Sequence, residues 1–311
     1  METRAVDADA GAQRPPKVID SHLHVWASPQ QAAEKYPYFP GQEPTLTGHV
    51  DFLLEKMAEA GVDGALLVQP ICHKFDHSYV TSVLKKYPSK FVGCCLANPT
   101  EDGGGIKQLE HLITKDGYRA VRFNPYLWPS DQLMTNEIGK AMFYKAGQLG
   151  ASVGFMCMKG LDLHLMEIQQ LCTEFPSTLV LLDHIAFCKP PTNDEERRLF
   201  SKLLNLSRFP QVYVKFSALF RVSRNQYPYE DLSDILSKLV SAYGANRVMW
   251  EDISKSHFHT LTIYSDFPFV VSECGYKEAK EAVYHLAKRA HLSNSELEWI
   301  MGATFHHIFN T

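Results

Sequence analysis

The chain has 311 residues and a formal net charge of −4, with 45% hydrophobic and 21% charged residues. This composition excludes a disordered protein, and the length fits one large barrel or two ordinary domains. The mild acidity gives no reason to expect a nucleic-acid partner. No apolar run of the sequence is long enough to span a bilayer, so we expect no membrane segment.

The first 16 residues are rich in alanine, carry three acidic residues and end in Pro-Pro. A secretory signal needs an apolar core and transit peptides are poor in acids, so we expect residues 1–16 to form a disordered lead. The seven cysteines are odd in number and lack CxxC spacing. A chain of this size needs no disulfides. We therefore expect reduced, buried thiols and a cytoplasmic protein.

Short β-rich runs alternate with segments of helical periodicity along the rest of the chain. The expected strands cover residues 18–24, 62–69, 91–96, 120–124, 152–158, 179–184 and 212–217, with a last strand near Val248. The expected helices cover residues 47–60, 77–87, 106–115, 137–149, 162–174, 194–206, 229–243 and 277–290. Eight βα units of this kind predict an α/β fold, a single-domain (β/α)8 TIM barrel over residues 17–311.

A doubly wound open sheet is the alternative architecture. It would place a glycine-rich phosphate-binding turn directly after the first strand. His22 and His24 stand there instead, and the three consecutive glycines at residues 103–105 lack the required spacing. The barrel is therefore the better prediction.

His22 and His24 are two residues apart at the end of the first expected strand. Alternation along a strand places both side chains on the same side. At the carboxyl end of a barrel strand that side faces the mouth, where two imidazoles can share a metal ion or a substrate oxygen. The alternative is that two polar residues simply end a strand.

Four further residues have side chains capable of chemistry. His184 ends the sixth expected strand and suits a metal ligand or a proton carrier near pH 7; the alternative is a buried histidine bonded to a backbone carbonyl. Asp266 precedes Phe-Pro after the last strand region and can deprotonate an attacking water; the alternative is an ordinary turn. His73 and His77 follow the second strand, where we expect solvent-exposed side chains.

Six motifs lie in order around the eight strands. They are IDSHLHVW at residues 19–26, GYRAVR at 117–122, LDH at 182–184, VYVKFS at 212–217, RVMW at 247–250 with SDFP at 265–268, and IMG at 300–302. In these motifs the chain resembles the amidohydrolase-related family of (β/α)8 enzymes, in the branch that contains lactonases and decarboxylases. The resemblance implies that His22, His24, His184 and Asp266 line the active site. In metal-dependent relatives the matching groups hold one divalent ion, with Asp266 as ligand, general base or both.

Other residues gain expected roles from this resemblance. Arg122 ends the fourth strand and can clamp a substrate carboxylate; a surface salt bridge is the alternative. Lys215 and Ser217 alternate on the seventh strand, so we expect both to face inward, with Lys215 fixing an anionic group or polarising a carbonyl. Trp26 and Tyr126 are expected to wall the pocket, with plain packing as the alternative.

The metal content stays open. Metal-dependent relatives usually place a histidine on strand five, but residues 154–159 read GFMCMK, where Cys157 is either a zinc ligand or a small buried hydrophobe. Strand four has Arg122 and no lysine to carbamylate, so a two-metal centre is not expected. Because the family includes metal-independent lactonases, we expect either no cofactor or one divalent ion, Zn or Mn.

A second departure lies after Trp250. In the family, Met-Trp-Gly runs directly into Ser-Asp-Phe-Pro, but here residues 251–264 intervene. The chain either loops out and returns to bring Asp266 to the barrel mouth, or strand eight ends at Trp250 and Asp266 is displaced. Asp252 is a rival carboxylate. A third alternative is that this chain is catalytically impaired and either binds a ligand or pairs with an intact subunit.

Together these observations predict a hydrolase acting by water attack on a carboxylate-bearing lactone or a related cyclic ester or amide. Asp266 would deprotonate the water, and His22, His24 and His184 would polarise the carbonyl and stabilise the oxyanion, directly or through one metal. The alternative is a metal-dependent decarboxylase on the same barrel. The expected partner is a small anionic substrate, and a homo-oligomer is possible.

Overall fold

The computed structural model describes residues 17–129, 132–250, 266–269, 271 and 274–309. The expected N-terminal lead and the segment 251–264 lie outside these residues. In the described part of the chain, no helix is both long and apolar enough to cross a bilayer.

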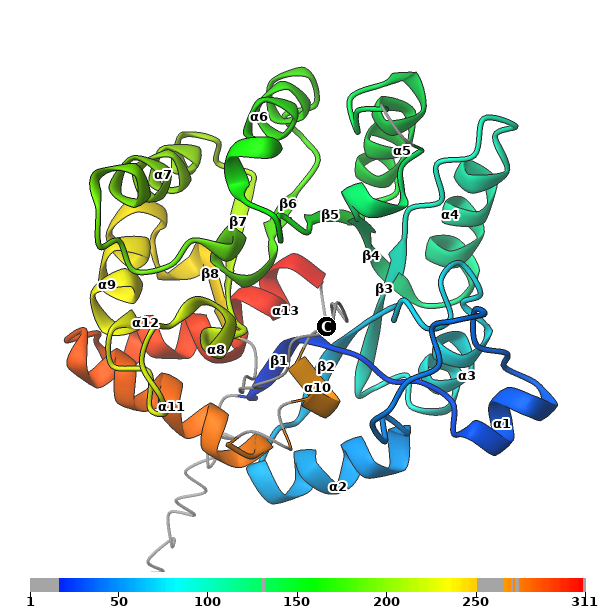
Figure 1. The fold of residues 1–311 in the computed structure, drawn as a ribbon, viewed down its shortest axis with the longest axis horizontal. Coiled ribbons are helices and arrows are strands. Elements are labelled where there is room, and N and C mark those ends of the chain that lie inside the picture. Colours follow the sequence, from blue (N-terminus) through cyan, green and yellow to red (C-terminus); the bar gives the residue numbers. More distant parts are fainter. Residues whose placement is uncertain (1–16, 130–131, 251–265, 270, 272–273, 310–311) are drawn as a thin grey trace, which may run out of the picture.

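Eight parallel strands pair in sequence order, each with the next, and form a nearly closed barrel surrounded by helices (Figure 1). The strands are β1 (Ile19–Leu23), β2 (Gly64–Val68), β3 (Phe91–Leu96), β4 (Tyr118–Phe123), β5 (Ser152–Phe155), β6 (Val180–Leu182), β7 (Val212–Phe216) and β8 (Val248–Trp250). The Ser21 hydroxyl donates to the Trp250 carbonyl at 2.7 Å and so joins β1 to β8. The predicted (β/α)8 barrel is confirmed.

The helices alternate with the strands and pack around them (Figure 1). They are α1 (Pro29–Glu34), α2 (Val50–Ala60), α3 (Ser78–Lys86), α4 (Gly104–Lys115), α5 (Glu137–Gln148), α6 (Leu165–Glu174), α7 (Asp194–Asn205), α8 (Leu219–Val222), α9 (Leu232–Tyr243), α10 (Asp266–Phe269), α11 (Tyr276–Arg289), α12 (Asn294–Glu298) and α13 (Thr304–Phe309). Local sequence accounts for their ends. In α2, the His49 imidazole caps the first turn, and Gly61 adopts the left-handed conformation (φ 63°) that ends the helix.

The apolar core has two parts. The larger one fills the layer between the strands and the surrounding helices. The smaller one lies inside the barrel and joins inward-facing side chains such as Leu66 and Leu181 in one cluster with Phe305 of α13. Because α13 covers strand starts such as Ile19, the polar ends of the strands are left to form the site at the opposite end.

The chain departs from the expected strand at the end of β6. The sequence predicts a strand through His184, but β6 ends at Leu182 and residues 183–187 form a turn. Four consecutive non-glycine residues there, His184 to Phe187, have left-handed φ values between 50° and 58°. Each such residue costs about 1–2 kcal/mol. Strain of this kind is found mainly at functional sites, and this turn positions His184.

Candidate active site

A cavity of about 250 Å³ opens at the carboxyl ends of the strands. Its wall includes His24 from the end of β1, Gln69 after β2, Arg122 from β4 and His184 after β6. Active sites of (β/α)8 enzymes lie at this end of the barrel. The cavity is therefore the candidate active site, and it contains residues that the sequence predicts for it.

The cavity wall is positively charged. Lys74, Arg122 and Arg221 line it, and no aspartate or glutamate does so among the residues that the structure describes. Cationic walls around a small enclosed volume attract and concentrate anions. The cavity thus suits a small anionic ligand.

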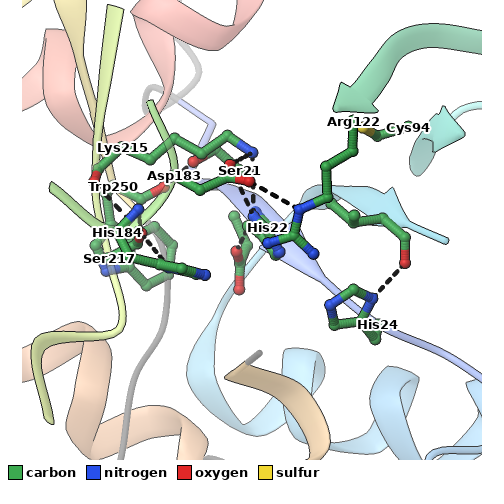
Figure 2. A network of polar contacts seen from close by, with 12 residues as sticks. Ser21, His22, His24, Cys94, Arg122, Asp183, His184, Lys215, Ser217 and Trp250 are labelled. Atoms are coloured by element: carbon green, nitrogen blue, oxygen red, sulfur yellow. Dashed lines mark hydrogen bonds and ion pairs between the residues drawn. The ribbon is translucent and has the colours of Figure 1, made fainter. Parts of the chain in front are cut away.

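A buried ionic cluster lies beneath the cavity, with Asp183 at its centre (Figure 2). One carboxylate oxygen of Asp183 accepts from Arg122 Nε at 2.9 Å. The other lies 3.0 Å from Lys215 Nζ and 3.3 Å from His22 Nδ1, and Lys215 Nζ lies 3.1 Å from the same His22 nitrogen. Asp183 therefore contacts residues from three strands, β1, β4 and β7.

The cluster determines the ionisation of its members. Burial by itself would raise the pKa of Asp183, but the Lys215 ammonium and the Arg122 guanidinium outweigh it and hold the pKa well below its ordinary value. Burial, followed by the positive charge of Lys215, lowers the pKa of His22 well below its ordinary value. Asp183 is thus a carboxylate, His22 is neutral, and two cations face one anion.

His24 is held in one tautomer. Its Nδ1 contacts the Val68 carbonyl, which can only accept, so Nδ1 carries the proton. Burial, followed by the charge of Arg122, lowers the pKa of His24 to about 3. The Nε2 atom is therefore unprotonated at neutral pH. It can accept a hydrogen bond, whereas the role of oxyanion donor expected for it would need the other tautomer.

The structure brings His184 close to the other two histidines. Its ring centre lies 4.8 Å from that of His22, which in turn lies 5.2 Å from that of His24. The Ser217 hydroxyl contacts both the backbone nitrogen of His184 (3.1 Å) and its Nδ1 (2.8 Å). Burial lowers the pKa of His184 well below its ordinary value. Ser217 therefore orients His184 from below the cavity.

The remaining predicted site residues divide between the cavity and its surroundings. Tyr126 lines the cavity, and its hydroxyl accepts from the Lys159 backbone at 3.0 Å. Trp26 is not part of the described lining: it is buried, its indole nitrogen donates to the Leu46 carbonyl at 3.0 Å, and its ring packs against Phe269 at 5.8 Å. The contacts of Trp26 therefore do not support its expected role in the pocket wall.

The backbone of Asp266 begins α10, but its side chain is outside the described part of the structure. The carbonyl of the next residue, Phe267, accepts from the His24 backbone nitrogen at 3.2 Å. The backbone of Phe267 thus lies beside the end of β1, whereas β8 ends at Trp250. The role of Asp266 as general base stays a prediction.

Sequence reasoning missed several residues and misplaced two. Asp183 belongs to the LDH motif, but the sequence predicts no role for it, and nothing in the local sequence around Lys74 and Arg221 signals a cavity position. His73 and His77 are buried, contrary to expectation. Both ring nitrogens of each contact backbone groups: His73 contacts Pro37 and Ala27, and His77 contacts Phe75 and Leu96. These two histidines are structural.

The described residues do not fit a metal centre. No group of three His, Cys, Asp or Glu side chains among them could hold a metal ion. Two cations against one carboxylate leave the cluster positively charged, which opposes a further divalent cation. Burial raises the pKa of the Cys157 thiol, which disfavours the thiolate that zinc binds. No step of the reaction proposed below passes through a metal.

Comparison with known proteins agrees with this architecture. The chain is similar to a 4-sulfomuconolactone hydrolase from Hydrogenophaga intermedia, with 25% identity and coverage of 76% of this chain and 74% of that protein. It is similar in structure to a probable 2-pyrone-4,6-dicarboxylic acid hydrolase from Acinetobacter baumannii, solved with citric acid bound (17% identity, 95% and 100% coverage, TM-score 0.73). It is also similar to a zinc-bound amidohydrolase from Burkholderia multivorans (18% identity, 94% and 99% coverage, TM-score 0.68).

The solved structures share the fold with this chain. The profile of the amidohydrolase family matches residues 19–304, from the first residue of β1 to the first residue of α13. This match covers the barrel and every described residue of the site. The chain belongs to the amidohydrolase family.

Proposed function

We propose that the protein is a hydrolase that opens a carboxylate-bearing lactone, or a related cyclic ester or amide, by attack of water. The observation that carries this proposal is the cavity wall, in which Lys74, Arg122 and Arg221 stand beside His184 with no described carboxylate. The similarity to hydrolases of a sulfomuconolactone and of a pyrone dicarboxylic acid, both acidic lactones by name, supports it.

Arg122 holds the carboxylate of the substrate. Its Nε donates to Asp183, which fixes the plane of the guanidinium and leaves the terminal nitrogens for a bidentate contact. Lys215 is buried below, where its charge both neutralises Asp183 and stabilises negative charge that develops above it. The ionic cluster is thus a preorganised support for an anion.

The reacting carbonyl of the substrate lies between His184 and α10. Asp266 deprotonates the attacking water, while His22 and His184 stabilise the oxyanion of the tetrahedral intermediate. Collapse of this intermediate breaks the ring carbon–oxygen bond, and the leaving oxygen takes up a proton. The product is an open-chain acid with one carboxylate more than the substrate.

The purified protein is tested by pH-stat for acid release from 2-pyrone-4,6-dicarboxylate, 4-sulfomuconolactone and simple lactone carboxylates. Asp266→Asn and His184→Ala should each lower the rate by at least a hundredfold. Unchanged hydrolysis in both variants would remove these residues from the mechanism. Absence of hydrolysis across the panel, with release of CO2 from aromatic acids and a stoichiometric metal, would favour the decarboxylase alternative.

We also propose that the protein is cytoplasmic and binds no nucleic acid. All seven cysteines are free thiols, and six of them are buried, as expected in a reducing compartment. Thiol titration of the unfolded protein should find seven reactive groups. Size-exclusion chromatography with light scattering tests whether the protein is a homo-oligomer. Turnover and thermal stability, compared with those of a variant lacking residues 251–264, test whether that segment impairs the enzyme.

A further inference from the structure

Lys74 lines the cavity and forms no ion pair within the described part of the chain. Its ammonium lies 4.2 Å from the ring centre of Phe39 and 5.6 Å from that of Phe75. Contact with an aromatic face stabilises a cation but does not neutralise it. Arg122, in the same wall, already donates to the Asp183 carboxylate at 2.9 Å. Lys74 therefore adds to the cavity a positive charge that no described carboxylate balances.

The backbone of Lys74 adopts a conformation that does not suit a lysine. Its φ is 48°, in the left-handed region, which glycine enters freely and residues with a Cβ seldom do. Strain of this kind persists only where the surrounding structure holds it, and it is concentrated at functional sites. The local conformation favours glycine, so the presence of a lysine here indicates a use for its side chain.

The loop that carries Lys74, residues 69–77, is held by three buried side chains. The amide nitrogen of Gln69 donates to the Lys74 carbonyl at 3.2 Å and to a second carbonyl of the loop at 2.7 Å. Both ring nitrogens of His73 and of His77 contact backbone groups of the loop and of neighbouring segments, at 2.9–3.2 Å. These contacts fix the backbone from which the Lys74 side chain extends, so its charge is preorganised.

Lys74 and Arg122 reach the cavity at different depths. Arg122 belongs to β4, is only 6% exposed and is bonded to Asp183 beneath the cavity. Lys74 belongs to the loop beyond β2, is half-buried and contacts Phe39, which is 42% exposed. Since β3 lies between β2 and β4, the two strands are about 10 Å apart. The cavity thus has one cation at its floor and another at its rim.

We propose that Lys74 binds a second acidic group of the ligand, while Arg122 binds the first. Apolar side chains such as Leu96, Met156 and Phe187 also line the cavity, so the body of the ligand is apolar. The cavity then selects organic dianions of about the size of one ring over the monoacids of the same skeleton. This inference rests on the proposed function in taking the cavity as the substrate pocket, and it narrows the substrate to a lactone with two acidic groups.

The contribution of Lys74 follows from its charge and its exposure. A hydrogen bond to a charged group corresponds to about tenfold to a hundredfold in Kd. Because Lys74 is half-buried, solvent weakens the contact and places it at the lower end, about tenfold. The preference concerns binding, so it is measured without turnover.

The test compares three ligands with one ring and different numbers of acidic groups, namely benzoate, isophthalate and terephthalate. Calorimetric titration of the full chain at low ionic strength gives the three Kd values. We expect at least one dicarboxylate to bind about tenfold more tightly than benzoate. Equal Kd values for all three, or no binding of either dicarboxylate at about 10 mM, would overturn the proposal.

Two substitutions to methionine assign the preference to a residue. Lys74→Met keeps the length of the side chain, so it should weaken dicarboxylate binding about tenfold and leave benzoate unchanged. The control is Lys159→Met: Lys159 is exposed and lies 4.9 Å from the ring centre of Tyr126, but it is not part of the described lining. This change should leave the ratio of Kd values unaltered. An equal loss for benzoate and the dicarboxylates in Lys74→Met would place both cations on one carboxylate and refute a second position.

Two further variants separate binding from stability. Lys74→Arg keeps the charge and should retain most of the preference. Lys74→Gly removes the charge and also relieves the backbone strain, so Tm should stay the same or rise while the preference disappears. If Lys74→Met does not fold, Lys74→Gly decides. A fall in Tm with an unchanged preference would make Lys74 a structural residue and overturn the proposal.

Hydrolysis assays distinguish a failure here from a failure of the proposed function. Lactone hydrolysis that does not depend on a second acidic group would refute the role of Lys74 and leave the hydrolase. A preference for dicarboxylates in binding, without hydrolysis of any lactone, would do the reverse.

Discussion

Replacing Asp183 by Asn tests the buried cluster most directly. Asp183 lies 3.0 Å from the Lys215 ammonium and 2.9 Å from the Arg122 guanidinium, and all three are buried. The amide keeps the shape of the side chain but removes its charge, so two buried cations lose their counter-ion. Removing one partner of a buried ion pair costs about 3–5 kcal/mol of unfolding free energy.

This cost corresponds to a measurable shift in the thermal midpoint. With an unfolding entropy of about 0.65 kcal/mol/K for a chain of this length, the loss of unfolding free energy lowers Tm by roughly 5–8 °C. Differential scanning calorimetry at pH 7 gives the shift. The matched control is Asp162→Asn, which breaks the 2.7 Å pair with Lys202, whose side chains are 52% and 46% exposed. That change should cost less than about 1 kcal/mol.

A second variant separates charge from packing. In Asp183→Asn with Lys215→Met, one of the two isolated cations is also removed, so part of the lost stability should return. The contribution of Asp183 also has a defined pH dependence. Because its folded pKa is depressed, its stabilisation is present above its unfolded pKa and is lost as pH falls further toward the folded value. A fall in Tm of less than about 2 °C in Asp183→Asn would refute the electrostatic account of the cluster.

Three further outcomes are expected. His24 has a folded pKa of about 3, so as pH falls the unfolded chain takes up a proton at this residue before the folded chain does. The free energy of unfolding should therefore fall as pH drops from about 6.5 to 3, and it should fall less in His24→Gln. Urea titrations that give the same pH dependence for both proteins would contradict this. Arg122→Lys keeps the positive charge but loses the planar guanidinium, so kcat/KM for a lactone carboxylate should fall about tenfold to a hundredfold. An equal loss for an uncharged lactone would argue against a carboxylate clamp. A Cβ at Gly48 would lie 2.3 Å from the Trp26 ring, so Gly48→Ala should cost about 1–3 kcal/mol by urea unfolding, and an unaffected midpoint would show that this packing can relax.

The amino-acid sequence by itself determined the architecture and part of the site. Hydrophobic runs of strand length alternate with helical periodicity, and this pattern specifies a (β/α)8 barrel because both depend on residues close together in the chain. Alternation within one strand predicted that His22 and His24 point to the same side, and their ring centres lie 5.2 Å apart. Arg122 was predicted as an anion clamp, and it lies in the wall of the cavity.

Only the tertiary structure decided how these residues act. Asp183 is the centre of the site because β4, β6 and β7 bring Arg122 and Lys215 to it from positions 61 and 32 residues away, and no local pattern records such a meeting. The tautomer of His24 depends on the Val68 carbonyl of a neighbouring strand. Charge balance, burial and hydrogen-bond direction are set by contacts between distant segments, and these contacts exist only once the barrel has closed.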